Sequence, residues 1–154
     1  MDGLVAGAVG GVISGVPSTL HALVRRGRPI EATLAAGSLL LPRENRLLPL
    51  VLAALPVHLA VSLGWGVVLS AGLPGKATAA WGALAGLGIA AFDLGVVGRR
   101  FPRLRELTLG PQLVDHLLYG WAVGAVLASR RESDGRRGTT TRPAPSAMTD
   151  TSAW

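Results

Sequence analysis

Four stretches of about twenty residues or more carry almost no charged side chain. They cover residues 3–24, 47–73, 78–98 and 107–128. About twenty helical residues span the hydrocarbon core of a bilayer. Because backbone groups in lipid must form their hydrogen bonds within the segment, spanning segments of this kind are helices. The sequence therefore predicts an all-α, integral membrane four-helix bundle.

The amino-acid composition supports this interpretation. Hydrophobic residues make up 49% of the 154 residues and charged residues only 16%, whereas about a quarter of a typical soluble domain is charged. This balance excludes an ordinary soluble enzyme domain, and the high apolar content excludes a disordered chain. The absence of cysteine excludes disulfide bonds, thiolate catalysis and cysteine-based zinc sites.

The segments outside the four stretches form three connections and a tail. The first connection contains an apolar insert over residues 30–41 that is too short to span a bilayer. Pro29 suits a helix start and Pro42 a helix stop, so we expect a short helix lying at the membrane interface. After the fourth stretch the chain turns polar, which predicts a disordered tail over residues 129–154.

Basic residues, mostly arginine, gather at the ends of the apolar stretches and give the chain a net charge of +6. This placement is typical of membrane-flanking charge and not of a nucleic-acid-binding face. The bilayer is therefore the expected partner, and nucleic acid is not. The first and third connections carry more basic residues than the other segments, so the positive-inside rule favours an outside N-terminus and C-terminus. The arginine-rich composition points to a bacterial, multi-pass protein of the cell (inner) membrane.

Small residues recur at every fourth position of the apolar stretches. Because lipid is as apolar as leucine, helices associate in a membrane where small residues let their backbones approach closely. We expect this pattern, a glycine zipper, to pack helices within the chain's own bundle; pairing with a second copy or with another membrane protein is the alternative. The glycines concerned are Gly3, Gly7, Gly11, Gly15, Gly82, Gly86, Gly120 and Gly124.

Five histidine and aspartate residues fall inside the predicted spans. His21, Asp93, Asp115 and His116 all lie within roughly 6–12 Å of one membrane interface, at about 1.5 Å of rise per residue. That interface is the one that carries the first and third connections, here named the arginine side. His58 lies deeper, near the middle of its span. Because ionisable groups are costly in a bilayer, these five residues are the candidate functional site.

Two interpretations of this polar set compete. As a site, it would form a proton relay, a cation or metal pocket, or a haem ligand pair made by His21 and His116. As structure, Asp93 would pair with an arginine such as Arg100, and the histidines would bond backbone carbonyls. The structural interpretation is favoured, because no metal-binding spacing occurs within one helix. We therefore predict no metal and no cofactor.

Catalytic motifs are also absent, so we predict no catalytic residue and no enzyme. The favoured function is that of a non-enzymatic accessory or scaffold that packs through its glycine-rich helix faces. The alternative is an oligomeric transporter, a proton or ion pathway, or a metal- or haem-binding membrane protein that uses the intramembrane Asp/His set.

Four strings carry a family resemblance: GVPSTLHAL, LGWGVVLS, DLGVVGRRFPR and DHLLYGWAVGAVL. They resemble a group of uncharacterised actinobacterial four-span membrane proteins and, more distantly, the YagU-like inner-membrane proteins. The resemblance covers roughly residues 3–128. It implies a multi-pass membrane protein and assigns no activity to any residue.

Overall fold

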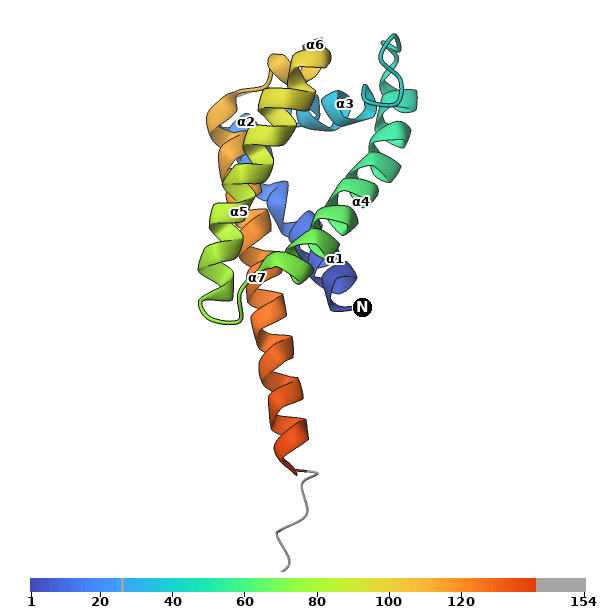
Figure 1. The fold of residues 1–154 in the computed structure, drawn as a ribbon. Helices are drawn as coiled ribbons and strands as arrows, with labels where there is room; N and C mark the ends of the chain where they lie inside the picture. Colours follow the sequence, from blue (N-terminus) through green and yellow to red (C-terminus); the bar gives the residue numbers. More distant parts are fainter. Residues whose placement is uncertain (26, 141–154) are drawn as a thin grey trace, which may run out of the picture.

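The computed structural model describes residues 1–25 and 27–140, and in these ranges the regular structure is entirely helical. The predicted all-α class is therefore confirmed for this part of the chain (Figure 1). The elements are α1 (Asp2–Ser14), α2 (Val16–Val24), α3 (Glu31–Gly37), α4 (Leu47–Gly72), α5 (Thr78–Phe92), the π-helix η1 (Asp93–Val97), the 3-10 helix η2 (Gly98–Arg100), α6 (Pro102–Arg105) and α7 (Leu109–Thr140).

Among the described residues, three helical segments are long and apolar enough to cross a membrane. They are Asp2–Val24, Leu47–Gly72 and Thr78–Arg100, which match three of the four predicted spans. Most of the fourth predicted span, from residue 109 on, lies in α7, which is not in this set. Gln112, Asp115 and His116 interrupt the apolar stretch of α7, so its composition alone does not identify it as a span.

The first spanning segment is broken at Gly15, between α1 and α2. Pro17 follows at the second position of α2, where a missing N–H costs no helical hydrogen bond. Because proline cannot donate to the carbonyl of Ile13, that carbonyl instead accepts the N–H of Gly15. Pro56, in contrast, lies inside α4 and does not end that helix.

The short helix predicted between the first two spans is confirmed, with narrower bounds, as α3. Leu34 and Ala35 are buried, and α3 packs against α4. A Cβ added to Gly37 would overlap the carbonyl of Leu50, so only glycine allows this approach. Its position at the membrane interface stays a prediction.

The tail prediction is wrong for residues 129–140, because α7 continues as a helix to Thr140. Hydrogen bonds to residues far away in the sequence stabilise the turns of α7 that follow residue 128. Arg130 donates to Asp2, and Arg131 donates to the carbonyl of Pro74. Glu132 and Arg136 also form an i,i+4 ion pair with a distance of 3.7 Å. The remainder of the predicted tail, residues 141–154, lies outside the described residues.

The central helix is α7, which packs along α5 and against α1 and α2, while α4 packs on α1 and α3. Figure 1 shows α7 running beside α5 and extending well beyond the other helices. The core that these contacts form consists of Ala6, Leu69, Ile89, Tyr119, Val123 and Leu127.

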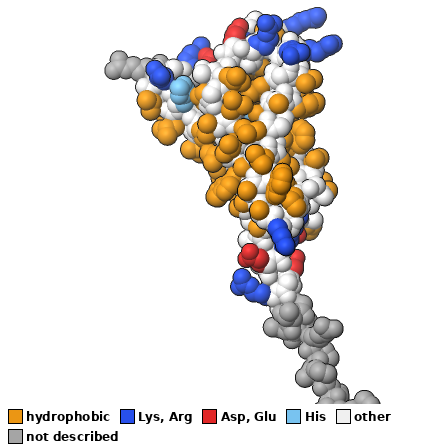
Figure 2. Space-filling model, turned by 60° about the vertical axis from the view of Figure 1, so that its left-hand side comes forward, with side chains coloured by type: hydrophobic (Ala, Val, Ile, Leu, Met, Phe, Trp, Pro, Cys, Tyr) orange, Lys and Arg blue, Asp and Glu red, His pale blue; other side chains and the backbone are white. Residues whose placement is uncertain are grey.

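Large hydrophobic side chains also cover the outside of the bundle. On α4, for example, Leu52, Leu55 and Leu59 are each more than half exposed. Figure 2 shows hydrophobic side chains between a group of arginines or lysines at one end and charged side chains where α7 leaves the bundle. An apolar surface of this extent is typical of a molecule that contacts lipid or other membrane proteins.

Candidate functional site

Glycines bring α1 and α4 into backbone contact. A Cβ added to Gly66 would lie 2.6 Å from the Cα of Gly7 and would overlap the carbonyl of Gly3. A Cβ on Gly11 would lie 2.7 Å from the Oγ of Ser62. Three of the four predicted glycines of the first span therefore face α4, and Gly15 does not, because no atom lies within 4 Å of its Cβ position. Gly15 lies instead at the break between α1 and α2.

A second glycine contact joins α5 to α7. Gly82 and Gly120 face each other so closely that a Cβ on either would overlap the carbonyl of the other. A Cβ on Gly86 would overlap the carbonyl of His116, and a Cβ on Gly124 would lie 2.5 Å from the carbonyl of Thr78. These close approaches fix the axial register of α7 along α5, and the register decides which polar side chains meet.

One result of this register is a contact between Asp93 and His116. Asp93 Oδ2 lies 3.4 Å from His116 Nε2, and both side chains are about one-fifth exposed. The other ring nitrogen, Nδ1, lies 2.7 Å from the carbonyl oxygen of Gln112. Asp93 begins the π-helix η1, and single π turns inside α-helices occur frequently at functional sites. The structure therefore pairs Asp93 with His116 and not with Arg100.

Asp115 has a different neighbour. Its Oδ1 accepts the backbone N–H of Ser18 at 3.0 Å, and the residue is 8% exposed. Ser18 lies in the first turn of α2, where N–H groups have no partner within the helix. Asp115 therefore caps the second half of the broken span by accepting one of these N–H groups.

Two further hydrogen bonds join α4 to its neighbours. His58 Nε2 lies 3.0 Å from the carbonyl oxygen of Gly11, so the imidazole donates to a backbone group of α1. The Tyr119 hydroxyl donates to the carbonyl of Ser62. His21 is partly exposed on α2, and no hydrogen bond or ion pair found among the described residues involves its side chain.

Four of the five predicted site residues thus take part in three separate interactions, and His21 takes part in none of them. The sequence did not identify the partners Ser18 N–H, Gln112 C=O and Gly11 C=O, because all three are backbone groups. Only the Gln112 carbonyl had a signal in the sequence, since it lies four residues before His116 on the same helix face.

Polar side chains also form hydrogen bonds between and within the connections at one end of the bundle. On the arginine side, Arg103 donates to Asn45 Oδ1 at 2.9 Å, which joins the first connection to the third. In the same connection Glu44 accepts hydrogen bonds from Arg46. Its hydrogen bonds with the Arg46 guanidinium, and then with backbone N–H groups, lower the pKa of Glu44 from 4.5 to about 2.

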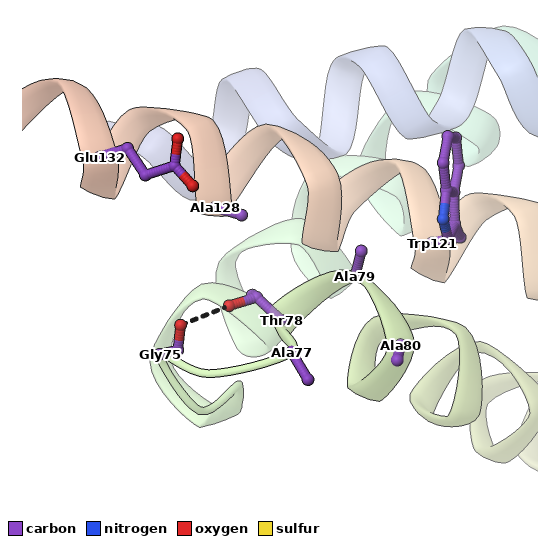
Figure 3. A pocket seen from close by; sticks show the side chains of 8 residues that line it. All are labelled: Gly75, Ala77, Thr78, Ala79, Ala80, Trp121, Ala128 and Glu132. Atoms are coloured by element: carbon purple, nitrogen blue, oxygen red, sulfur yellow. Dashed lines mark hydrogen bonds between the residues drawn. The ribbon is translucent and has the colours of Figure 1, made fainter.

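Two hollows on the described surface lie apart from the Asp93–His116 pair. One, of about 550 Å³, is lined by Glu31, Arg103, Glu106 and Leu107. Figure 3 shows the other, where the hydroxyl of Thr78 bonds the carbonyl of Gly75 at the start of α5. It is lined by Gly75, Ala77, Thr78, Ala79, Ala80, Trp121, Ala128 and Glu132. Within residues 1–25 and 27–140, no group of three His, Asp or Glu side chains is placed to hold a metal ion.

Comparison of the chain with protein-family models, with curated proteins and with solved structures finds no match. The interpretation of the site therefore depends on its geometry.

Proposed function

We propose that this chain is a four-span membrane protein that serves as a non-enzymatic accessory or scaffold. The main observation that supports this proposal is the close fit of α7 along α5. Thr78, at the start of α5, lies against Gly124, and Asp93, just past its end, lies against His116. Because the segment Thr78–Arg100 is long and apolar enough to cross a membrane, a helix fixed along it would cross the same layer.

Contacts at the two ends of the bundle support the same arrangement. At one end Arg130 donates to Asp2 at 2.7 Å, and Arg131 donates to the carbonyls of Leu73 and Pro74. The N-terminus, the second connection and the emerging part of α7 therefore share one side. The arginine-rich first and third connections share the other, where Arg103 bonds Asn45. The positive-inside rule then favours a cytoplasmic arginine side, with the N-terminus outside.

The packing of the bundle supports a scaffold more than a conduit. Glycine backbones make close contacts between its helices. The two hollows described above lie away from the Asp93–His116 pair. Large apolar side chains point outward instead, where lipid and partner helices are the available contacts.

Single cysteines in this cysteine-free chain test the fourth span. Lys76→Cys, Arg100→Cys and Ser133→Cys each place a thiol at an exposed position. A membrane-impermeant thiol reagent applied to intact cells should label residues 76 and 133 but not residue 100. Labelling of residues 100 and 133 from the same side contradicts a spanning α7.

A photo-crosslinking residue tests the scaffold role. Leu55 and Leu84 point outward, whereas Val123 is fully buried and provides the matched control. We expect one defined membrane protein, or a second copy, to crosslink at an outward position and nothing to crosslink at residue 123. In parallel, proteoliposomes should show no proton or cation flux. A flux that Asp93→Asn or Asp115→Asn abolishes contradicts the scaffold role and supports the transport alternative.

A further inference from the structure

We infer that Asp93 and His116 form a proton-binding site between η1 and α7, in which the pair binds one proton, on His116 Nε2 or on the Asp93 carboxyl group. The inference concerns a bound proton and goes beyond the scaffold role. Two observations support it: the hydrogen-bonding atoms around the imidazole, and the position of Asp93 in an apolar segment.

The Gln112 carbonyl determines which ring nitrogen of His116 carries a hydrogen. A carbonyl oxygen can only accept, and it lies 2.7 Å from Nδ1, so Nδ1 carries a hydrogen and donates it. In a neutral imidazole with this tautomer, Nε2 has only a lone pair. An ionised carboxylate also has only lone pairs, and its Oδ2 lies 3.4 Å from Nε2. Two acceptors that face each other repel, and one additional proton converts the contact into an attraction.

The net charge of the pair also favours the additional proton. With the proton present, the pair is either a carboxylate with an imidazolium or a carboxylic acid with a neutral imidazole, and both have zero net charge. Without it, the pair carries one negative charge inside a segment that is long and apolar enough to span a membrane. Uncompensated charge is costly at that depth, so the protein favours the protonated pair.

The surrounding titratable groups leave this proton to the pair. On α7, Asp115 is occupied by the N–H of Ser18, and the Tyr119 hydroxyl donates to the carbonyl of Ser62. On α2, the side chain of His21 takes part in no hydrogen bond described above. Arg99 and Arg100 of η2 are exposed and form no ion pair with Asp93 among the described residues. Among the side chains that the structure describes, His116 is therefore the one basic group placed against Asp93.

The π turn gives the bound proton a structural role. Asp93 starts η1, so its side chain direction depends on a widened turn that contacts α5 and leads into η2. The proton joins this turn to α7. Loss of the proton replaces the attraction with repulsion at that contact, and η1 and α7 should then separate locally.

Nuclear magnetic resonance of the full chain in lipid bilayers, with ¹⁵N-labelled histidine and ¹³C-labelled aspartate, tests the site. The chain has only three histidines, and His58→Gln identifies the signals of residue 58. At neutral pH we expect a proton on Nδ1 of His116 and a second proton on the pair, on Nε2 or on the Asp93 carboxyl group. In Asp93→Asn the new amide can donate to Nε2, so His116 should become neutral, with a bare Nε2, and the chain should bind one proton fewer.

The result does not depend on the variant folding, because the wild-type spectrum alone tests the site. A bare Nε2 together with an ionised Asp93 at neutral pH overturns the inference. A second arm replaces choline with Na⁺ at constant ionic strength. If Na⁺ displaces the proton of the pair, the site is a cation site and the proposal is wrong; an unchanged spectrum supports it.

Discussion

At the residue scale, two adjacent side chains of α7 perform separate tasks. Asp115 and His116 differ by about 100° in direction around the helix axis, and they contact different elements. Asp115 binds the first turn of α2, while His116 binds Asp93. The divergence of the two directions was predictable from the sequence, but the two partners were not, because they lie on other segments.

Asp115 is expected to stabilise the broken span through its cap on α2. Replacing it with alanine leaves the N–H of Ser18 without an acceptor, so the free energy of unfolding should fall by about 1 kcal/mol. Asp115→Asn is the matched control, because its amide oxygen still accepts. Reversible unfolding in mixed micelles measures the change, and hydrogen exchange at Ser18 locates it. If the Ser18 amide stays equally protected in Asp115→Ala, the cap has no such role.

Glu44 should stay mostly ionised between pH 4.5, its usual pKa, and about pH 2. Since its pKa in the folded chain is about 2, below its usual 4.5, the Glu44–Arg46 interaction contributes fully above pH 4.5 and is lost as the pH falls through about 2. A ¹³C titration of the Glu44 carboxyl measures this. Arg46→Gln should move the midpoint back toward 4.5.

Arg43→Gln is the control for this titration, because Arg43 is exposed and is not part of the Glu44–Arg46 ion pair. A wild-type midpoint close to 4.5, or equal midpoints in the wild-type and Arg46→Gln chains, would show that Arg46 does not hold the carboxylate.

At the element scale, two glycine contacts organise the bundle: α1 with α4, and α5 with α7. Each brings backbone against backbone, where no other residue fits. The four-residue spacing separates contact glycines from exposed ones in these helices, because residues two positions apart point about 200° apart around the helix axis. Gly64 and Gly88 belong to the same helices as Gly66 and Gly86, and nothing lies within 4 Å of their Cβ positions.

These neighbouring glycines provide a direct comparison. Gly66→Ala places a Cβ against Gly3 and Gly7, so we expect the free energy of unfolding to fall by roughly 1–3 kcal/mol. Gly64→Ala makes the same chemical change in open space, and alanine favours helix by about 1 kcal/mol. Its stability should be unchanged or higher.

The same contrast should hold in α5, where Gly86→Ala is expected to destabilise the chain and Gly88→Ala is not. Unfolding of all four variants in one detergent mixture measures the differences. Similar effects for the contact and exposed positions of a helix would mean that the glycine contact does not hold that pair together.

At the scale of the whole molecule, α7 is the element that the other helices share. It packs on α5, α1 and α2, and it carries every described side chain that pairs with Asp93 or with Ser18. This central role explains why its composition is the least apolar of the predicted spans. A helix that faces protein on several sides can hold polar side chains that would be costly against lipid. The cysteine-labelling map described above tests whether it also crosses the bilayer.

The sequence by itself determined the helical class, three segments long and apolar enough to span a membrane, and the short helix between the first two. These features depend on local composition, because the length and polarity of a segment decide whether a helix can bury its backbone in lipid. Tertiary structure alone decided the rest: the helical course of residues 129–140, the π turn at Asp93, and the partners of Asp115, His116 and His58. Those partners are set by the register in which glycine backbones meet, and register is a relation between segments that no single segment encodes.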